Sequence, residues 1–450
     1  MSSEPQSVRR QTTVRAFRPR NATALGRRDF LTGSAIATAA LVGAPLSSAS
    51  ASAKPKAAYL VPGYRVDIAS YRGRAIMDSP DMRRAFPAGY DGTGTLLTRV
   101  DEGDGSVRRA LMPLRGHAIV VAPSRARAVW ASMNGDSLLS FDPHSLELET
   151  FVSAHGEGFI GGGHAVFTAA GDQVLVAERK RYGPQPARPE EQFGRITIRD
   201  PKDLSVLESY SCHGVSPHQI RILADGRHIA ISNYGSTNLP KPGEPLQILE
   251  PSLTVLELAS GRLLTKWIGP DPRYELRHLA AHSLDRIAAI LAHVVPAEDA
   301  QSLRLARDRV YEPDLSVEAD YAYLPAPIQF YDAAQPNRPK AASLPSDARD
   351  ARQGQSIVYD PDHDEVIVTF ASSHRVIAFD AASGGIKTIV ETDRLGLRYP
   401  RGLALHPDGA HYAVSGSWRG IQLFRRGSHE PSLARAMHAV FFDHSHLAIT

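Results

Sequence analysis

The chain has a single cysteine, Cys212, so it can form no internal disulfide and has no Cys-x-x-Cys-His haem attachment. It also lacks an apolar run of the roughly 20 residues that a membrane-spanning helix needs. The P-loop, the G-x-G-x-x-G turn and the G-x-S-x-G elbow are missing as well. These absences argue against a disulfide-stapled domain, a membrane-spanning helix, a nucleotide-binding fold and an α/β-hydrolase.

Positive charge is concentrated at the N-terminus. Residues 1–53 contain seven arginines and two acidic residues, whereas the whole chain has a formal net charge of +3. The remainder therefore carries a net charge of −2. A mature chain of that charge gives no reason to expect a nucleic-acid partner.

The basic N-terminal segment has the pattern of an export signal. Arg27 and Arg28 are followed by Phe30, Leu31 and an apolar run to Leu46, and Ala-x-Ala sites come after it. A basic region, a short apolar core and a small-residue cleavage site make a signal peptide, and the paired arginines indicate the twin-arginine form. We therefore expect residues 1–53 to be a signal peptide, the mature protein to be periplasmic or exported, and no membrane span to remain after cleavage.

The rest of the chain repeats one pattern, which is a polar residue, an alternating apolar strand, a Pro/Asp/Gly turn and a second strand. Seven copies can be aligned, and they begin at His117, His164, His218, His278, Gln355, Arg401 and His438. A third and a fourth strand follow in most copies. Four short strands per roughly 40–60 residues are typical of a propeller blade. The sequence therefore predicts an all-β, seven-bladed β-propeller with four-stranded antiparallel blades over residues 86–450, after an N-terminal extension at 54–85.

The last copy stops after two strands, of which Leu447–Ile449 is predicted to be the second. Strand-like pieces at Gly94–Val100 and Arg109–Pro113 are expected to supply the outer strands of this blade. Pairing of N- and C-terminal strands would close the ring and remove its exposed edge strands. An open stack of sheets or two sandwiches is the alternative, and either leaves the C-terminal half-blade unexplained.

The first residue of each copy is expected to lie at one mouth of the central channel, because the first strand of a blade lies nearest the axis. Five of these seven residues are histidine, although the chain has only 18 histidines. Neutral imidazole is a common metal ligand. The predicted ligands of a metal ion, iron or copper, are His117, His164, His218, His278 and His438. The alternative is that the imidazoles form hydrogen bonds and plug the channel.

Other polar residues are expected around the same mouth. Gln355 and Arg401 begin two of the copies, and Glu178 and Asn233 end two of the second strands. A guanidinium beside a bare cation is unfavourable, so Arg401 favours an anionic metal complex, and Glu178 could offset its charge. Cys212 with the adjacent His213 is either a soft ligand pair or a buried structural feature.

Four segments resemble the DUF1513 family. They are Arg115-Gly116-His117, Gly163-His164-Ala165-Val166-Phe167, His213-Gly214-Val215-Ser216-Pro217-His218-Gln219 and Arg277-His278-Leu279. The resemblance implies a twin-arginine-exported propeller of uncharacterised biochemistry, and it adds His213 to the residues of interest. Genes of this family often lie beside those of imelysin-like and di-haem oxidoreductase proteins, which implies a role and partners in periplasmic iron uptake.

These observations lead to one leading hypothesis and two alternatives. The first is a periplasmic metal-handling propeller, associated with iron uptake, that binds a metal or metal complex at the histidine-lined mouth. The second is a copper- or haem-dependent oxidoreductase. The third is a protein-interaction scaffold for an iron-uptake partner. The sequence leaves open whether the protein is an enzyme.

Overall fold

Most of the described chain forms short strands, in which successive side chains point to opposite faces of a sheet. In β14 (His228–Asn233), for example, Ile229 and Ile231 are fully buried on one face of the strand. No helix among the described residues is long and apolar enough to span a membrane. The computed structural model describes residues 57–68, 82–84, 86, 90, 92–153, 158–180, 194–236, 250–270, 274–293, 325–336, 339–418, 420–436 and 446–450.

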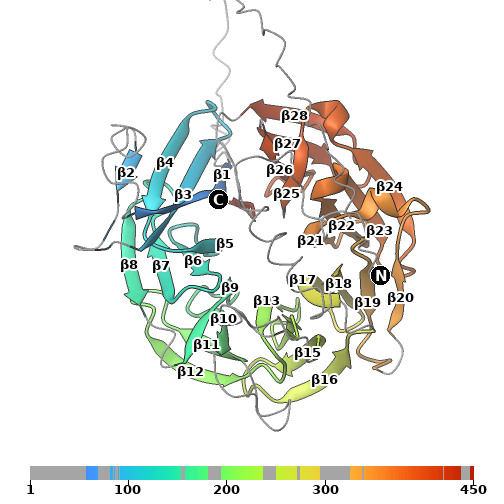
Figure 1. Ribbon diagram of the computed structural model, residues 1–450, viewed down its shortest axis with the longest axis horizontal. Coiled ribbons are helices and arrows are strands. Elements are labelled where there is room, and N and C mark those ends of the chain that lie inside the picture. The colour runs from blue at the N-terminus through green and yellow to red at the C-terminus, as the bar shows by residue number, and fades with distance from the viewer. Residues whose placement is uncertain are drawn as a thin grey trace, which may run out of the picture. The chain divides into compact units, whose positions relative to one another are not determined.

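The predicted seven-bladed propeller is confirmed, since seven antiparallel sheets surround a common centre (Figure 1). Each of six sheets is built from four strands that are consecutive in the chain and lie side by side in that order.

The first three of these sheets hold most of the histidines of interest. Their strands are β5 (Gly116–Val121), β6 (Ala128–Ser132), β7 (Ser137–Phe141) and β8 (Leu148–Ser153); β9 (Phe159–Phe167), β10 (Val174–Lys180), β11 (Gly194–Arg199) and β12 (Val206–Ser211); and β13 (Pro217–Ile222), β14, β15 (Ser252–Glu257) and β16 (Leu263–Ile268).

The next three sheets complete the consecutive series. Their strands are β17 (Tyr274–Ser283), β18 (Arg286–His293), β19 (Ile328–Tyr331) and β20 (Lys340–Ser343); β21 (Gly354–Asp360), β22 (Glu365–Phe370), β23 (Arg375–Asp380) and β24 (Ile386–Glu391); and β25 (Arg398–Leu405), β26 (His411–Trp418), β27 (Gly420–Arg425) and β28 (Pro431–Ala436). Short 3-10 turns also occur, at η5 (Ala348–Ala351), η6 (Ala371–Ser373) and η7 (Asp393–Leu395).

The seventh sheet joins the two ends of the propeller, as predicted. Its order is β2-β4-β3-β1-β29, in which β3 (Thr93–Asp101) and β4 (Val107–Met112) are the predicted outer strands. A short strand, β2 (Met82–Arg84), pairs in parallel with the outer edge of β4. The pairing between β1 (Ala58–Asp67) and β29 (Ala448–Ile449) is antiparallel and closes the ring.

Two assignments within this sheet differ from the prediction. The segment at Ala448–Ile449 is the innermost strand of its blade rather than the second. The second strand is β1, which comes from the residues predicted to be an N-terminal extension, so the propeller begins at Ala58 rather than at residue 86. Four strands, β1 to β4, precede β5 in the chain and take the outer positions of this sheet, and β29 takes the innermost position.

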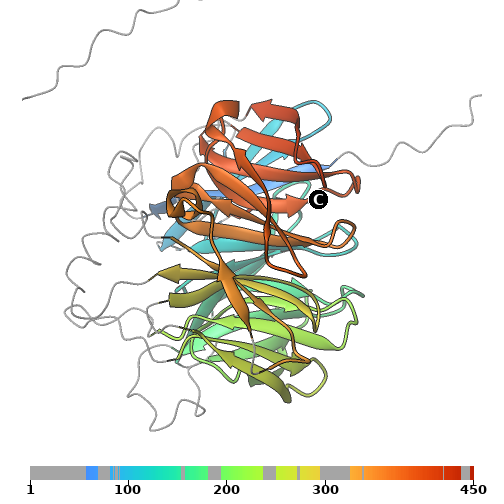
Figure 2. The same cartoon turned by 90° about the vertical axis from the view of Figure 1, so that its right-hand side faces the viewer.

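The hydrophobic core lies between neighbouring sheets, which pack face to face (Figure 2). One cluster, for example, joins Leu175 and Ile196 of one sheet with Ile220 and Ile231 of the next. In the closing sheet, Tyr59 and Val61 pack toward the preceding blade, whereas Leu60 packs toward the following one. Closure by β1 therefore contributes apolar contacts on both faces as well as backbone hydrogen bonds.

Truncating Leu60 should destabilise the protein if β1 is an integral strand. Leu60 is fully buried, and Leu-to-Ala substitutions at such positions cost about 2–5 kcal/mol through lost transfer energy and the cavity left behind. We expect Leu60→Ala to lower the free energy of unfolding by about that amount in urea unfolding experiments. Leu264→Ala, at a side chain that is 42% exposed on β16, is the matched control and should change it little. Equal effects of the two substitutions would show that β1 is dispensable.

Candidate metal centre

A β-bulge near the start of the inner strand positions each central histidine. The pairing of β5 with β6 shifts register between Gly116 and Ile119, a step that contains His117. Equivalent shifts enclose His164 in β9, His218 in β13 and His278 in β17. A bulge removes residues from the regular ladder and re-aims their side chains. The repeated bulge therefore turns four imidazoles from successive blades toward the axis.

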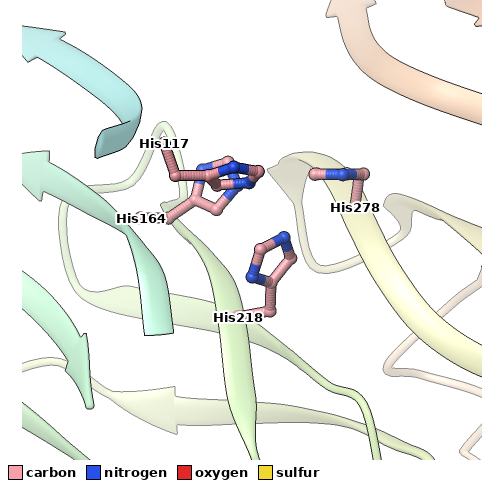
Figure 3. Close-up of side chains that lie close together, drawn as sticks. All are labelled: His117, His164, His218 and His278. Atoms are coloured by element: carbon pink, nitrogen blue, oxygen red, sulfur yellow. The ribbon is translucent and has the colours of Figure 1, made fainter. Parts of the chain in front are cut away.

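The four imidazoles form a compact, buried cluster, as Figure 3 shows. One nitrogen from each of His117, His164, His218 and His278 lies within 4.8 Å of the others. The side chains are at most 5% exposed, and the centres of neighbouring rings are 4.5–6.2 Å apart. The sequence prediction that these four residues meet is therefore correct in geometry, while their role as ligands remains a prediction.

A fifth imidazole, from His446, completes the cluster. Its ring centre lies 4.5 Å from that of His117 and 4.8 Å from those of His164 and His278. The Nε2 atoms of His446 and His117 are 3.0 Å apart. Two nitrogens bound at right angles to one ion, each about 2.1 Å from it, are also about 3.0 Å apart. This spacing suits one shared ion, and in its absence it suits a hydrogen bond between the two rings.

Among the described residues, His446 precedes the seventh inner strand and joins the ring. The sequence alignment placed the start of the seventh copy at His438, which lies outside the described residues. The structure places the inner strand at Ala448–Ile449, two residues beyond His446. Because β29 is only two residues long, it is too short to show the alternating pattern that identified the other inner strands. The Nδ1 atom of His446 lies 3.2 Å from Ser356 Oγ of β21.

Hydrogen bonds at Nδ1 determine the tautomer of two of the imidazoles. His278 Nδ1 is 3.1 Å from Gln219 Oε1, which also accepts the Leu279 N–H, so the ring must donate from Nδ1. His218 Nδ1 likewise donates to the Gly162 carbonyl at 2.5 Å, although Arg179 Nη2 lies 3.1 Å away. In both rings Nε2 then carries the lone pair that a metal requires, an arrangement typical of metal-binding histidines. His218 Nε2 and His164 Nε2 have no hydrogen-bond partner among the described residues.

Burial keeps the cluster uncharged. Removal from water, together with repulsion between neighbouring imidazoles, lowers the pKa of His117, His164 and His218 well below its usual value. The pKa of His446 falls to about 3, because its ring is buried and the guanidinium groups of Arg221 and Arg401 lie nearby. Neutral imidazole is the form that binds metals, so the site is prepared to bind an ion without first releasing protons.

The other residues predicted at the mouth have different surroundings. Gln355 and Arg401 are buried at the corresponding bulges of β21 and β25. Glu178 does not serve to balance Arg401, since its carboxylate accepts hydrogen bonds from Arg195, Thr197 and Arg199 within its own blade. Asn233 is also held within its blade, where its amide donates to Thr254 Oγ1.

His213 and Cys212 lie apart from the imidazole cluster. His213 lies in the connection between β12 and β13, and its Nε2 is 3.1 Å from the carbonyl of Gly261, which lies between β15 and β16. Burial raises the pKa of the Cys212 thiol to about 12, and its Sγ donates to the Gly214 carbonyl. Cys212 is therefore a structural residue, as one of the two interpretations proposed. Gln219, which orients His278, was not singled out from the sequence, although it directly follows His218.

In a second set of potential ligand groups, Asp360, His363 and Glu365, both carboxylates are already engaged in ion pairs. Asp360 is paired with Arg426, and Glu365 Oε2 accepts from Lys387 at 2.9 Å. Burial opposes ionisation of Asp360, but hydrogen bonds from Arg426 and His363 outweigh it and hold its pKa below the usual value. These groups form an ion-pair network, which leaves the imidazole cluster as the candidate metal centre.

Comparison with known proteins supports the resemblance seen in the sequence. Residues 110–321 match the family described as "Protein of unknown function (DUF1513)", and this range includes four of the five clustered histidines. No curated protein matches the chain. Among solved structures, Kuenenia stuttgartiensis Hydrazine Synthase is similar with a TM-score of 0.50 and 15% sequence identity, over 77% of this chain and 96% of that chain. At this identity the likeness shows the fold alone.

The depressed imidazole pKa values predict a stability that falls in acid. Below a pH of about 6.5 the histidines of the unfolded chain bind protons, whereas the buried rings of the folded protein do not. Each such ring therefore lowers the free energy of unfolding by about 1.4 kcal/mol at pH 5.5 relative to neutral pH. We expect His164→Gln to reduce the loss of stability between pH 7.5 and 5.5 by about 1 kcal/mol in chelator-treated protein, measured by urea unfolding, because burial lowers the pKa of this ring. The exposed His144→Gln is the control and should leave the acid loss unchanged. An identical acid loss for His164→Gln and the wild type would contradict the assignment of neutral rings.

Proposed function

Because this chain is a DUF1513 protein, and the function of that family is unknown, we propose its function from the histidine cluster: it binds a transition-metal ion on the propeller axis. The observation that carries this proposal is the convergence of buried imidazole nitrogens within 4.8 Å of one another. Two of these rings have Nδ1 committed to an oxygen acceptor, so that Nε2 faces the cluster as a lone-pair donor.

The chemistry of the donors narrows the choice of metal. All ligands of the cluster are imidazoles, with no thiolate or carboxylate among its described members. Imidazole suits Zn, Cu, Fe and Ni, whereas Mg and Ca prefer oxygen ligands. Iron and copper are the ions we favour, as the sequence analysis did. Ring centres no more than 6.2 Å apart leave no room for a porphyrin between them, so the site would take an ion rather than a haem.

Charge around the cluster favours a metal that arrives with an anionic ligand. Arg179 lies against His218, and Arg221 and Arg401 are close enough to lower the pKa of His446. A divalent ion held by neutral imidazoles would keep its full charge beside these guanidinium groups. An anion bound to the metal or near it would offset this repulsion. We therefore propose a metal-handling protein whose cargo is an ion with an accompanying anion.

We further propose that the protein works outside the cytoplasm, in iron uptake. Support comes from the twin-arginine pattern at Arg27 and Arg28, which lies in the part of the chain that the structure does not describe, and from the iron-linked family resemblance. Export after folding would allow the metal to be inserted inside the cell. Partners of the imelysin-like and di-haem oxidoreductase type remain part of this proposal.

The proposal is tested by the metal content of purified protein. Chelator-treated protein is dialysed separately against Fe²⁺, Cu²⁺, Zn²⁺ and Ni²⁺, and bound metal is measured by elemental mass spectrometry. We expect about one equivalent of the preferred ion in the wild type, and a loss of at least tenfold in affinity for His164→Ala/His218→Ala, since each ligand removed weakens coordination.

His213→Asn is the matched control for this experiment. His213 has a positive φ of 54°, which Asn tolerates better than Ala, and it lies outside the cluster. This variant should bind metal like the wild type. Metal binding that persists in His164→Ala/His218→Ala, or that disappears in His213→Asn alone, would overturn the assignment of the site.

A further inference from the structure

A partly open cavity of about 310 Å³ lies in the central channel next to the histidine cluster. Inner strands of several blades contribute its wall, and His164 and His446 are shared between the cavity and the cluster. Polar and apolar groups both line the wall, and its apolar side chains include Ile119, Val121, Val358, Leu403, Leu405 and Leu447. At about 30 Å³ for each water-sized group, the cavity has room for a molecule of roughly ten non-hydrogen atoms.

One cation, Arg221, is among the residues that line this cavity. None of the described residues gives its guanidinium a hydrogen bond or an ion pair, and no described residue of the cavity wall is acidic. Arg221 lowers the pKa of both His164 and His446, which places its charge on the histidine side of the cavity. Burial alone accounts for the lowered pKa of Arg221 itself.

Arg221 is half-buried, and a guanidinium that loses part of its hydration without a partner to repay the loss is destabilising. Two fully buried arginines of the β9–β12 blade, by contrast, are engaged. Arg179 contacts the Pro217 carbonyl and Asn134, and Arg199 pairs with Glu178. Arg221 instead lines the cavity, where an anionic ligand would supply a partner for its charge.

We propose that this cavity binds a small carboxylate with an apolar body, whose carboxylate pairs with Arg221. The planar guanidinium presents parallel N–H groups that match the two oxygens of a carboxylate. The apolar side chains of the wall would bury a short aliphatic chain or a single aromatic ring. An inorganic anion has no such apolar group. The site does not require the metal, since the contacts that define it come from Arg221 and the channel wall.

The proposal is tested by calorimetric titration of chelator-treated protein with benzoate and butyrate. Butyramide, which has nearly the shape of butyrate but no charge, tests the need for charge, and inorganic phosphate, which is charged but has no apolar body, tests the need for that body. We expect benzoate or butyrate to bind and butyramide not to bind. Arg221→Met should lose at least tenfold in affinity, while Arg221→Lys, which keeps the charge but not the planar fork, should lose less. Arg108→Met, at a side chain 46% exposed on β4, is the control and should bind like the wild type.

A second readout separates a ligand site from a structural role. If Arg221 is retained for binding, Arg221→Met should raise the midpoint of thermal unfolding of the ligand-free protein, since it removes a half-buried charge that has no partner among the described residues. A lower midpoint would mean that Arg221 stabilises the fold and would overturn the proposal. Binding of phosphate without either carboxylate, no binding of any probe, or equal carboxylate affinity in Arg221→Met would each overturn it as well. Because the titration uses metal-free protein, its failure would leave the metal proposal untouched.

Discussion

The structure depends on a local irregularity that recurs at the start of the inner strands. In the six blades built from consecutive strands, the ladder between the first and second strand shifts register at the residue that faces the axis. A regular strand would point that side chain into the contact between blades. The bulge instead releases the side chain from the ladder. Because the blades are arranged radially, the released side chains of successive blades surround one point.

The ring is chemically unusual because several imidazoles are buried together beside guanidinium groups. Imidazoles can accept this environment by remaining neutral, as the lowered pKa values of His117 and His218 show. Guanidinium groups cannot lose their protons in the same way. Arg221 and Arg401 therefore keep their positive charges near His446, which disfavours a bare cation beside them. The metal proposal and the carboxylate proposal both follow from this imbalance of charge.

Much of the fold followed from the sequence because propeller blades repeat. The alternating strands and their turns predicted seven blades, and they predicted the outer strands β3 and β4 of the closing sheet. The closing blade broke the repeat, since its inner strand is two residues long and its second strand comes from the other end of the chain. Because β29 is so short, its sequence has no alternating pattern that could be recognised. For the same reason the sequence did not single out His446 as a member of the ring. The pairing of β1 with β29 could not be recognised either, because the two strands lie at opposite ends of the chain.

The sequence by itself determined the blade pattern and placed histidine, glutamine or arginine at the start of each inner strand, because alternation and turn residues are local properties. The tertiary structure alone decided which of these side chains meet. Glu178 and Asn233 were expected at the mouth, but neighbouring strands engage them, whereas Gln219 and His446 contact the cluster without a local signal. Distances between imidazoles of different blades depend on the closure of the whole ring, and no segment of the sequence encodes that closure alone.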